Sequence, residues 1–199
     1  ALGASAVVGT YFLWGPAALH LAAIRAYSAA NSFVLLAIPL FIFMGCMLER
    51  SGIAQGLYGL MHKWLGGVRG GLAVGTVIVC AIFAAMVGVS GAATVTMALV
   101  AMPSMLRYGY SKYLTVGTIA AGGALGVLIP PSVLFIVLGL YTNTSVGRLF
   151  IGGLPAGLLL VLLFILYSLV ACRLNPELGP AVPAQERASW AERLRALRA

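Results

Sequence analysis

Long apolar runs without charge dominate the sequence. Five stretches contain no Asp, Glu, Lys or Arg, and they are residues 1–24, 26–48, 70–106, 113–147 and 149–172. Each is at least as long as the run of about 20 apolar residues with which a helix crosses a bilayer. The pattern predicts an all-α polytopic membrane protein.

Glycine and proline interrupt two of these runs near their middles. Gly88-Val89-Ser90-Gly91 divides the run 70–106, and Pro130-Pro131 divides the run 113–147. Proline removes a backbone donor and forces its predecessor away from helical geometry. Inside a bilayer such a break is tolerated only where it faces protein or a water-filled cavity. We therefore expect interrupted helices in both runs.

Positive charges between the runs predict the topology. The loops on both sides of run 70–106 are basic, and basic loops favour the cytoplasmic side. Their cations are Arg50, Lys63, Arg69, Arg107 and Lys112. The run 70–106 could then be one overlong helix, two cramped spans or a re-entrant hairpin. The hairpin explains most, with its tip at Ser90–Ala93 and unequal arms at 70–87 and 94–106.

The predicted organisation has four parts. Residues 173–199 combine a proline-containing linker with an amphipathic helix, in which Trp190, Leu194 and Leu197 share one face. The parts are spans with a surface connector at 1–69, a part with two interrupted segments at 70–147 (hairpin 70–106, broken helix 113–147), a transmembrane span at 148–172, and the linker with its interfacial helix at 173–199.

Composition excludes several classes of function. The chain is 62% hydrophobic and only 8% charged, which excludes a soluble globule. Its net charge of +8 is spread between the spans and the tail, so we expect a bilayer and no nucleic acid as its partner. Glu49 lies beside Arg50 at the end of a run, and no Asp or Glu lies inside the runs. The sequence therefore offers no path of carboxylates for protons. Cys46, Cys80 and Cys172 are far apart and are interpreted as buried small hydrophobic residues.

Gly88-Val89-Ser90-Gly91 also has the G-x-S-G form found around the nucleophile of intramembrane serine proteases of the rhomboid type. Such a serine needs a general base within hydrogen-bonding reach. The histidines, His20 and His62, both precede the serine and lie near span ends. The protease is therefore the weaker alternative. A channel-like scaffold is another alternative, although the runs offer no continuous polar face to line a pore.

Ion coordination is the chemistry that the interruptions favour. Unwound backbone exposes carbonyl oxygens, and Ser90 and Thr94 add hydroxyl oxygens that suit Na⁺. Half-helix N-termini at the breaks 88–93 and 129–132 would face anionic groups of a substrate. We expect Na⁺ as the bound ion, with Ser90 and Thr94 as its ligands, and no other cofactor.

Several motifs together resemble one family. They include Gly88-Val89-Ser90-Gly91, Ile38-Pro39-Leu40-Phe41 and, above all, the stretch from Gly122 to Ser132, GGALGVLIPPS. These resemble the large permease subunit, DctM type, of tripartite ATP-independent periplasmic (TRAP) transporters. The family's large subunit is about twice as long, so the chain is expected to be its N-terminal half. Ala92 and Ala93 depart from the family, which often has hydroxyl residues there.

The resemblance implies one repeat of an inverted-repeat elevator transporter in the bacterial inner membrane, and no enzyme. In such a transporter the spans at 1–69 would belong to the scaffold and residues 70–147 to the transport domain. It implies Na⁺-coupled import of organic acid anions, such as C4-dicarboxylates or sialic acid. The expected partners are a small permease subunit (DctQ type) and a periplasmic substrate-binding protein (DctP type). The expected ion and substrate site consists of Ser90, Gly91, Ala92, Thr94, Gly122, Gly123, Gly126, Ile129, Pro130, Pro131 and Ser132.

Overall fold

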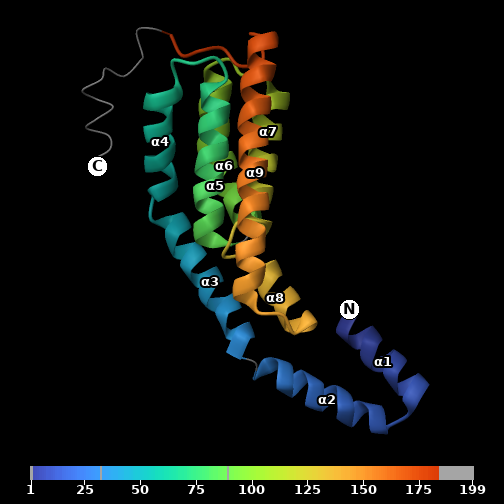
Figure 1. Cartoon of the computed structure of the whole chain (residues 1–199). Helices are drawn as coiled ribbons and strands as arrows, with labels where there is room; N and C mark the ends of the chain where they lie inside the picture. The colour runs from blue at the N-terminus through green and yellow to red at the C-terminus, as the bar shows by residue number, and fades with distance from the viewer. Residues whose placement is uncertain (1, 32, 89, 184–199) are drawn as a thin grey trace. The chain divides into compact units, whose positions relative to one another are not determined.

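The computed structural model describes residues 2–31, 33–88 and 90–183 (Figure 1). These residues form helices joined by turns and irregular segments, and none of them forms a strand. The all-helical fold class is therefore confirmed for the described chain. The contacts divide it into two compact units, 1–39 and a second that begins at Leu40, and each is described by itself.

The first unit contains α1 (Leu2–Trp14), α2 (Ala17–Ala30) and the start of α3 (Phe33–Arg50). Gly15 adopts a left-handed conformation with φ 74°, and Pro16 follows it. This geometry ends α1 after 13 residues. The run 1–24 is therefore divided between two short helices.

The second unit is built around one central helix. Its elements are the rest of α3, α4 (Ile53–Leu65), α5 (Gly71–Val87), α6 (Ser90–Arg107), α7 (Lys112–Ala124), the 3₁₀ helix η1 (Leu125–Val127), α8 (Val133–Thr142) and α9 (Val146–Leu174). Most residues of α5 are buried, and it packs against α4, α6, α7, η1 and α9. An apolar surface on every side is typical of a helix that is enclosed in this way.

Helices α5 and α6 form an antiparallel hairpin. The Leu72 N–H donates a hydrogen bond of 3.2 Å to the Tyr110 hydroxyl, which joins the open ends of the two arms. Gly88 is left-handed at φ 66° and ends α5. The predicted tip at Ser90–Ala93 is wrong, because these residues already form the first turn of α6. The arms, of 17 and 18 residues, are also nearly equal rather than unequal.

The run 113–147 is interrupted over a longer stretch than its prolines alone require. Helix α7 ends at Ala124, η1 continues for three residues, and irregular backbone extends to Ser132 before α8 begins. The break therefore starts earlier than the predicted 129–132. It positions the start of α8 beside the hairpin turn.

The segment that follows α9 ties one end of the second unit together. Gly70 donates a hydrogen bond of 3.0 Å to the Gly179 carbonyl, and Ser111 donates one of 3.0 Å to Leu178. The segment thus joins the turn before α5 to the turn before α7. We call this the cation-rich end, because the turns and helix termini that meet there carry Lys63, Arg69, Arg107, Lys112 and Arg173.

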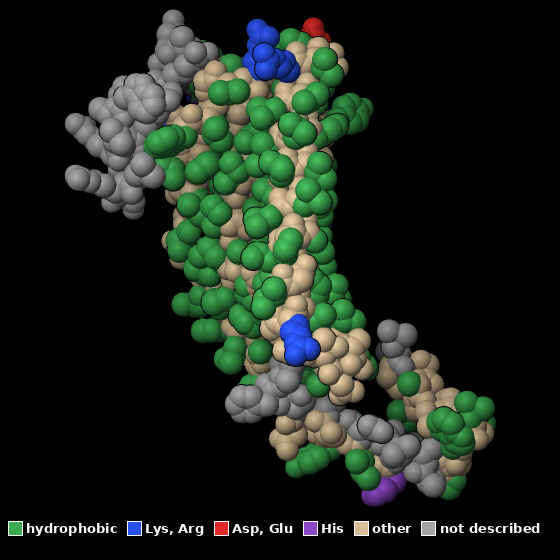
Figure 2. All heavy atoms as spheres, in the orientation of Figure 1, with side chains coloured by type: hydrophobic (Ala, Val, Ile, Leu, Met, Phe, Trp, Pro, Cys, Tyr) green, Lys and Arg blue, Asp and Glu red, His purple; other side chains and the backbone are tan. Residues whose placement is uncertain are grey.

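Apolar side chains cover much of the visible lateral face of the second unit, and cationic side chains lie towards its ends (Figure 2). Among the described residues, α9 is the single helix that is long and apolar enough to cross a membrane. The bent pair Leu35–Arg50 and Ile53–Leu65, at 58°, provides a second candidate span. Helices α5 and α8 are apolar but shorter. The re-entrant and multi-pass topology stays a prediction.

Three smaller expectations can be compared with the structure. Cys80 and Cys172 are buried as predicted, whereas Cys46 is exposed, so the interpretation of Cys46 as a buried residue is wrong. The predicted surface connector within 1–69 corresponds to α4, which packs one face against α5 through Ala54 and Tyr58. The predicted interfacial helix after residue 185 lies outside the described residues.

The hairpin predicts a specific labelling pattern. We expect cysteines introduced at Arg69 and Arg107, in a Cys46→Ser background, to resist a membrane-impermeant maleimide added outside spheroplasts. Arg148 lies at the end of α9 that is farther from the cation-rich end, and this 29-residue helix is about 43 Å long. Arg148→Cys should therefore lie on the outer side of the membrane and react. Permeabilisation should make all three positions reactive. Labelling of position 69 or 107 from outside would contradict the topology.

Candidate functional site

The turn of the hairpin lies against the break between α7 and α8. The Val133 N–H, the first donor of α8, donates a hydrogen bond of 3.4 Å to the Gly88 carbonyl. A Cβ atom at Gly88 would overlap the Pro131 carbonyl oxygen. The two interrupted segments, more than 40 residues apart in sequence, are thus in direct backbone contact.

Helix α6 also approaches α7 closely through its first turn. A Cβ atom at Gly123 would overlap the Thr94 hydroxyl oxygen, and one at Gly122 would lie 2.7 Å from the Cys80 sulfur. Small residues are the usual means by which helices in membranes approach each other. Thr94 therefore faces α7, and Gly122 faces α5.

Two hydroxyl groups beside the break donate hydrogen bonds to backbone carbonyls of this chain. Thr94 Oγ1 donates a hydrogen bond of 2.8 Å to the Ser90 carbonyl, and Ser132 Oγ donates one of 2.7 Å to the Val127 carbonyl. A hydroxyl that donates its proton in this way retains oxygen lone pairs. Both side chains therefore present acceptors, which are the groups that coordinate a cation.

Helix termini of both polarities meet at the same place. Helices α6 and α8 begin here at Ser90 and Val133, and their N-termini carry partial positive charge. Helix α5 ends here at Val87, and its C-terminus carries partial negative charge. Irregular backbone with this arrangement of half-helices is typical of transporter sites for an anion and its coupling cation.

The predicted site residues have different positions around this junction. Ser90 and Thr94 are half-buried, and Gly91 has open space around it. Ser132 is buried, with 1% of its surface exposed. Ile129 packs against α9, where a Cβ at Gly157 would lie 2.8 Å from its side chain. The described residues of the set are Ser90, Gly91, Thr94, Gly122, Gly123, Gly126, Ile129, Pro130, Pro131 and Ser132. The side chain of Ala92 lies outside the described part of the structure.

Glu49, which lies near the end of α3, contacts the hairpin. The Thr96 hydroxyl, on α6, donates a hydrogen bond of 2.7 Å to Glu49 Oε1 on α3. Thr96 is buried, with 4% of its surface exposed, and Glu49 is half-buried. Nothing in the spacing of these residues identifies the pair, because the contact joins residues 47 positions apart.

The protease alternative is inconsistent with the position of His62. Its ring lies 5.1 Å from that of Tyr108, which follows the last residue of α6. Ser90 is at the other end of that helix, which is about 27 Å long. His62 therefore cannot act as the base for Ser90.

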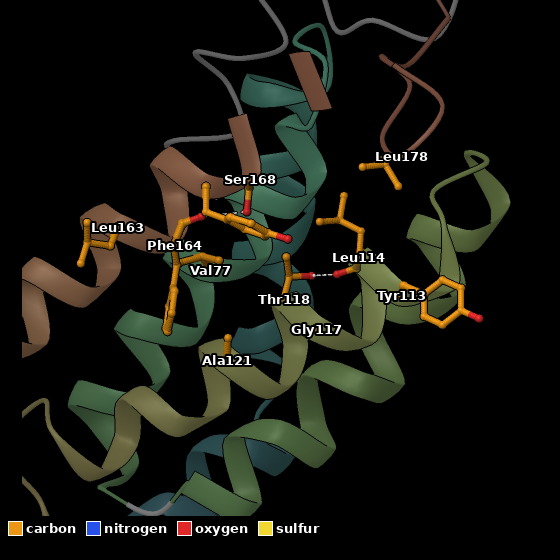
Figure 3. Close-up of a pocket in the computed structure, with 11 residues that line it drawn as sticks. Val77, Tyr113, Leu114, Gly117, Thr118, Ala121, Leu163, Phe164, Ser168 and Leu178 are labelled. Atoms are coloured by element: carbon orange, nitrogen blue, oxygen red, sulfur yellow. Dashed lines mark hydrogen bonds between the residues drawn. The ribbon is translucent and has the colours of Figure 1, made fainter. Parts of the chain in front are cut away.

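A groove of about 580 Å³ between α7 and α9 is mostly apolar (Figure 3). Its hydroxyls from Thr118 and Ser168 donate to their own helices, at 2.8 Å to Leu114 and Phe164. The groove lacks charged lining residues. It does not have the convergent polar groups that orient a polar substrate.

The described residues form a helical fold with interrupted helices and one clear apolar span, which is compatible with a membrane protein. Residues 1–199 match the family described as the DctM component of the tripartite ATP-independent periplasmic transporter. The chain belongs to this family of TRAP transporter large permease proteins.

Relatives with different substrates resemble the chain. It is 35% identical over 181 residues to the C4-dicarboxylate TRAP transporter large permease protein DctM of Pseudomonas aeruginosa, covering 91% of this chain and 42% of the relative. It is 36% identical over 197 residues to the protein of the same description from Vibrio cholerae, covering 98% and 42%. It is 36% identical over 164 residues to the ectoine/5-hydroxyectoine permease protein of Ruegeria pomeroyi, covering 82% and 37%. The chain thus spans about two fifths of the length of these relatives.

The contact between α6 and α7 predicts an unequal response to two glycine substitutions. We expect Gly123→Ala to destabilise the protein by about 1–3 kcal/mol, because the added methyl group overlaps Thr94. Gly117→Ala, in the same helix with open space around it, should be neutral or stabilising. Thermal unfolding of the complete permease in detergent measures both. Equal effects of the two substitutions would contradict this packing.

The Glu49–Thr96 hydrogen bond predicts a stability effect of its own. We expect Thr96→Val, which keeps the shape and removes the donor, to cost about 0.5–1.5 kcal/mol because the Glu49 carboxyl loses a hydrogen bond from a buried hydroxyl. Thr142→Val on α8 is the control, since its exposed hydroxyl bonds only its own helix. The same thermal unfolding measurement applies, and an equal response of both variants would count against the interaction.

Proposed function

We propose that the chain is part of the membrane subunit of a Na⁺-coupled secondary transporter that imports organic acid anions. In this proposal a periplasmic binding protein delivers the anion, a small permease subunit completes the membrane complex, and the complex works in the bacterial inner membrane. Membership of the TRAP family supports the transport role. The contact of the hairpin turn with the break at Pro131 is the observation that carries the proposed site.

The local chemistry supports a cation beside the hairpin turn. Ser90 and Thr94 contribute hydroxyl oxygens, and the interrupted backbone near Ser132 contributes carbonyl oxygens. Neutral oxygen ligands match Na⁺, a hard cation that needs no carboxylate. In our proposal Na⁺ is a transported substrate and binds between the first turn of α6 and the break.

The helix N-termini support an anion as the second substrate. Neither α6 nor α8 has an acidic residue in its first turn, so the partial positive charge at these termini is not offset there. A carboxylate group of the substrate would bind near Ser90 and Val133. We propose that the hairpin and α8 move together in an elevator-type cycle, because they share a backbone hydrogen bond.

Uptake measurements on a ligand variant test the proposal. We expect Ser90→Ala to raise the Na⁺ concentration for half-maximal uptake by about tenfold, the effect of losing roughly 1.4 kcal/mol of ion binding. Apparent substrate affinity at saturating Na⁺ should change less. The assay uses the complete transporter in proteoliposomes with its binding protein, a radiolabelled C4-dicarboxylate and a controlled Na⁺ gradient.

Ser168→Ala provides the matched control, because that buried hydroxyl bonds its own helix in α9. Its Na⁺ dependence should match that of the unsubstituted protein. Uptake that ignores Na⁺ and follows a proton gradient would refute the proposed site. No uptake of any organic acid, under either gradient, would refute the transport function itself.

A further inference from the structure

The last turns of α3 lie against the hairpin along a narrow stripe. The residues of α3 after Leu40 that are at least partly buried recur at helical spacing, and they are Phe41, Gly45, Leu48 and Glu49. A Cβ atom at Gly45 would lie 2.6 Å from the Val87 side chain, at the end of α5. Glu49 accepts the hydrogen bond from Thr96, in the second turn of α6. The stripe therefore contacts both arms of the hairpin near its turn.

The acceptor that Thr96 uses differs from that of other threonines in this unit. Five of them donate to the carbonyl four residues earlier in the chain, and they are Thr76, Thr94, Thr115, Thr118 and Thr142. Thr96 donates instead to a carboxyl group on another helix, at 2.7 Å. The Ala92 carbonyl lies four positions earlier in α6, where a threonine hydroxyl can bond its own helix. The Thr96 hydroxyl therefore has an alternative acceptor within α6.

A glycine joins α3 to α4, where the chain changes direction by 58° (Figure 1). Gly52 has a φ angle of 78°, and a Cβ atom placed there would have only the Gln55 side chain within 4 Å. Ser51 and Ile53, on either side of it, are exposed. Hinges are short segments of this kind, in which a few residues absorb the change in φ and ψ. The joint thus connects α3 to α4, which packs on α5, without being packed itself.

Separation of α3 from the hairpin would leave no buried polar group unpaired. Glu49 is already half-buried and would gain water, while the Thr96 hydroxyl would turn to its own helix. The separation therefore avoids the penalty of an unsatisfied donor or acceptor. The apolar contact that would be lost is small, because Gly45 at its centre has no side chain and Phe41 and Leu48 are only partly buried. One hydrogen bond is thus a large part of what holds α3 in place.

We propose that the Glu49–Thr96 hydrogen bond is a latch that holds α3 against the hairpin. When Thr96 turns to the Ala92 carbonyl, the latch opens and α3 swings about Gly52. The latch is close to the junction, because Thr96 lies about 9 Å along α6 from Ser90. Its role in transport rests on the proposed function, in which the hairpin has to separate from α3 before it moves with α8. The latch itself is a two-state contact that a distance measurement detects without transport.

Spin labels on the complete permease measure the two states. One label is attached to Cys46, which is exposed on α3, and the other to Tyr113→Cys, at an exposed position on α7. Double electron–electron resonance in detergent gives the distribution of distances between them. We expect the latched distance to dominate, and Thr96→Val to lower the ratio of latched to released molecules about fivefold, the effect of losing one hydrogen bond. A Cys46→Ser variant measures any labelling of other cysteines.

Four variants distinguish a latch from a general loss of stability. Thr96→Ser retains the hydroxyl and should restore the latched population. Thr118→Val removes a buried hydroxyl that bonds its own helix, and it should leave the distances unchanged. Gly45→Ala should release α3 by a different route, because its methyl group overlaps Val87. Gly56→Ala, at a helical glycine with open space around it, should not release α3.

The latch and the proposed function can fail separately. Distances that Thr96→Val leaves unchanged, or that it and Thr118→Val change equally, would overturn the latch whatever the uptake result. Uptake that ignores Na⁺ would refute the proposed ion site without altering the distances. If Thr96→Val does not fold, Glu49→Ala and Gly45→Ala carry the test, and unchanged distances in both would overturn the latch.

Discussion

The structure of the second unit depends on the satisfaction of backbone polar groups where two helices are interrupted. Inside a membrane an unpaired N–H or carbonyl costs several kcal/mol, because no water replaces the lost partner. The first N–H of α8 donates to the Gly88 carbonyl at the hairpin turn, and the Ser132 hydroxyl donates to the Val127 carbonyl. The hairpin turn thus supplies the acceptor, and the start of α8 after the break supplies the donor, of a hydrogen bond that satisfies both. Loss of this contact would leave unpaired groups in both segments.

Close approach is the second requirement, and glycine provides it at defined positions. Gly88 has a positive φ angle and contacts the Pro131 carbonyl, while Gly123 contacts Thr94. On the other side of the break, Gly153 and Gly157 bring α9 against it, and a Cβ at Gly153 would meet the Phe135 ring. The break is therefore enclosed by α6, α7 and α9. Its irregular backbone faces protein, which is the environment that a break inside a bilayer would need.

The sequence predicted the interruptions well and the contacts between elements poorly. Pro130-Pro131 and Gly88 are local signals, because proline and glycine act on the backbone of their own residues. The position of the hairpin tip was wrong by several residues, since Ser90 and its successors are compatible with either a turn or a helix. The Glu49–Thr96 hydrogen bond and the burial of Tyr58 depend on how α3, α4 and α6 pack. No local pattern encodes that packing.

The two ends of α6 differ in whether a charged side chain offsets the partial charge of the helix terminus. Arg107 lies in the last turn of α6, where it offsets the partial negative charge of the C-terminus. The first turn contains no acidic residue to offset the N-terminus in the same way. Helix α8 has the same pattern at Val133, and both N-termini lie at the junction. The positive ends of two helices therefore converge at the junction without acidic side chains in their first turns. This partial positive charge, which no acidic residue of those turns offsets, is the reason why we propose an anionic substrate at the junction.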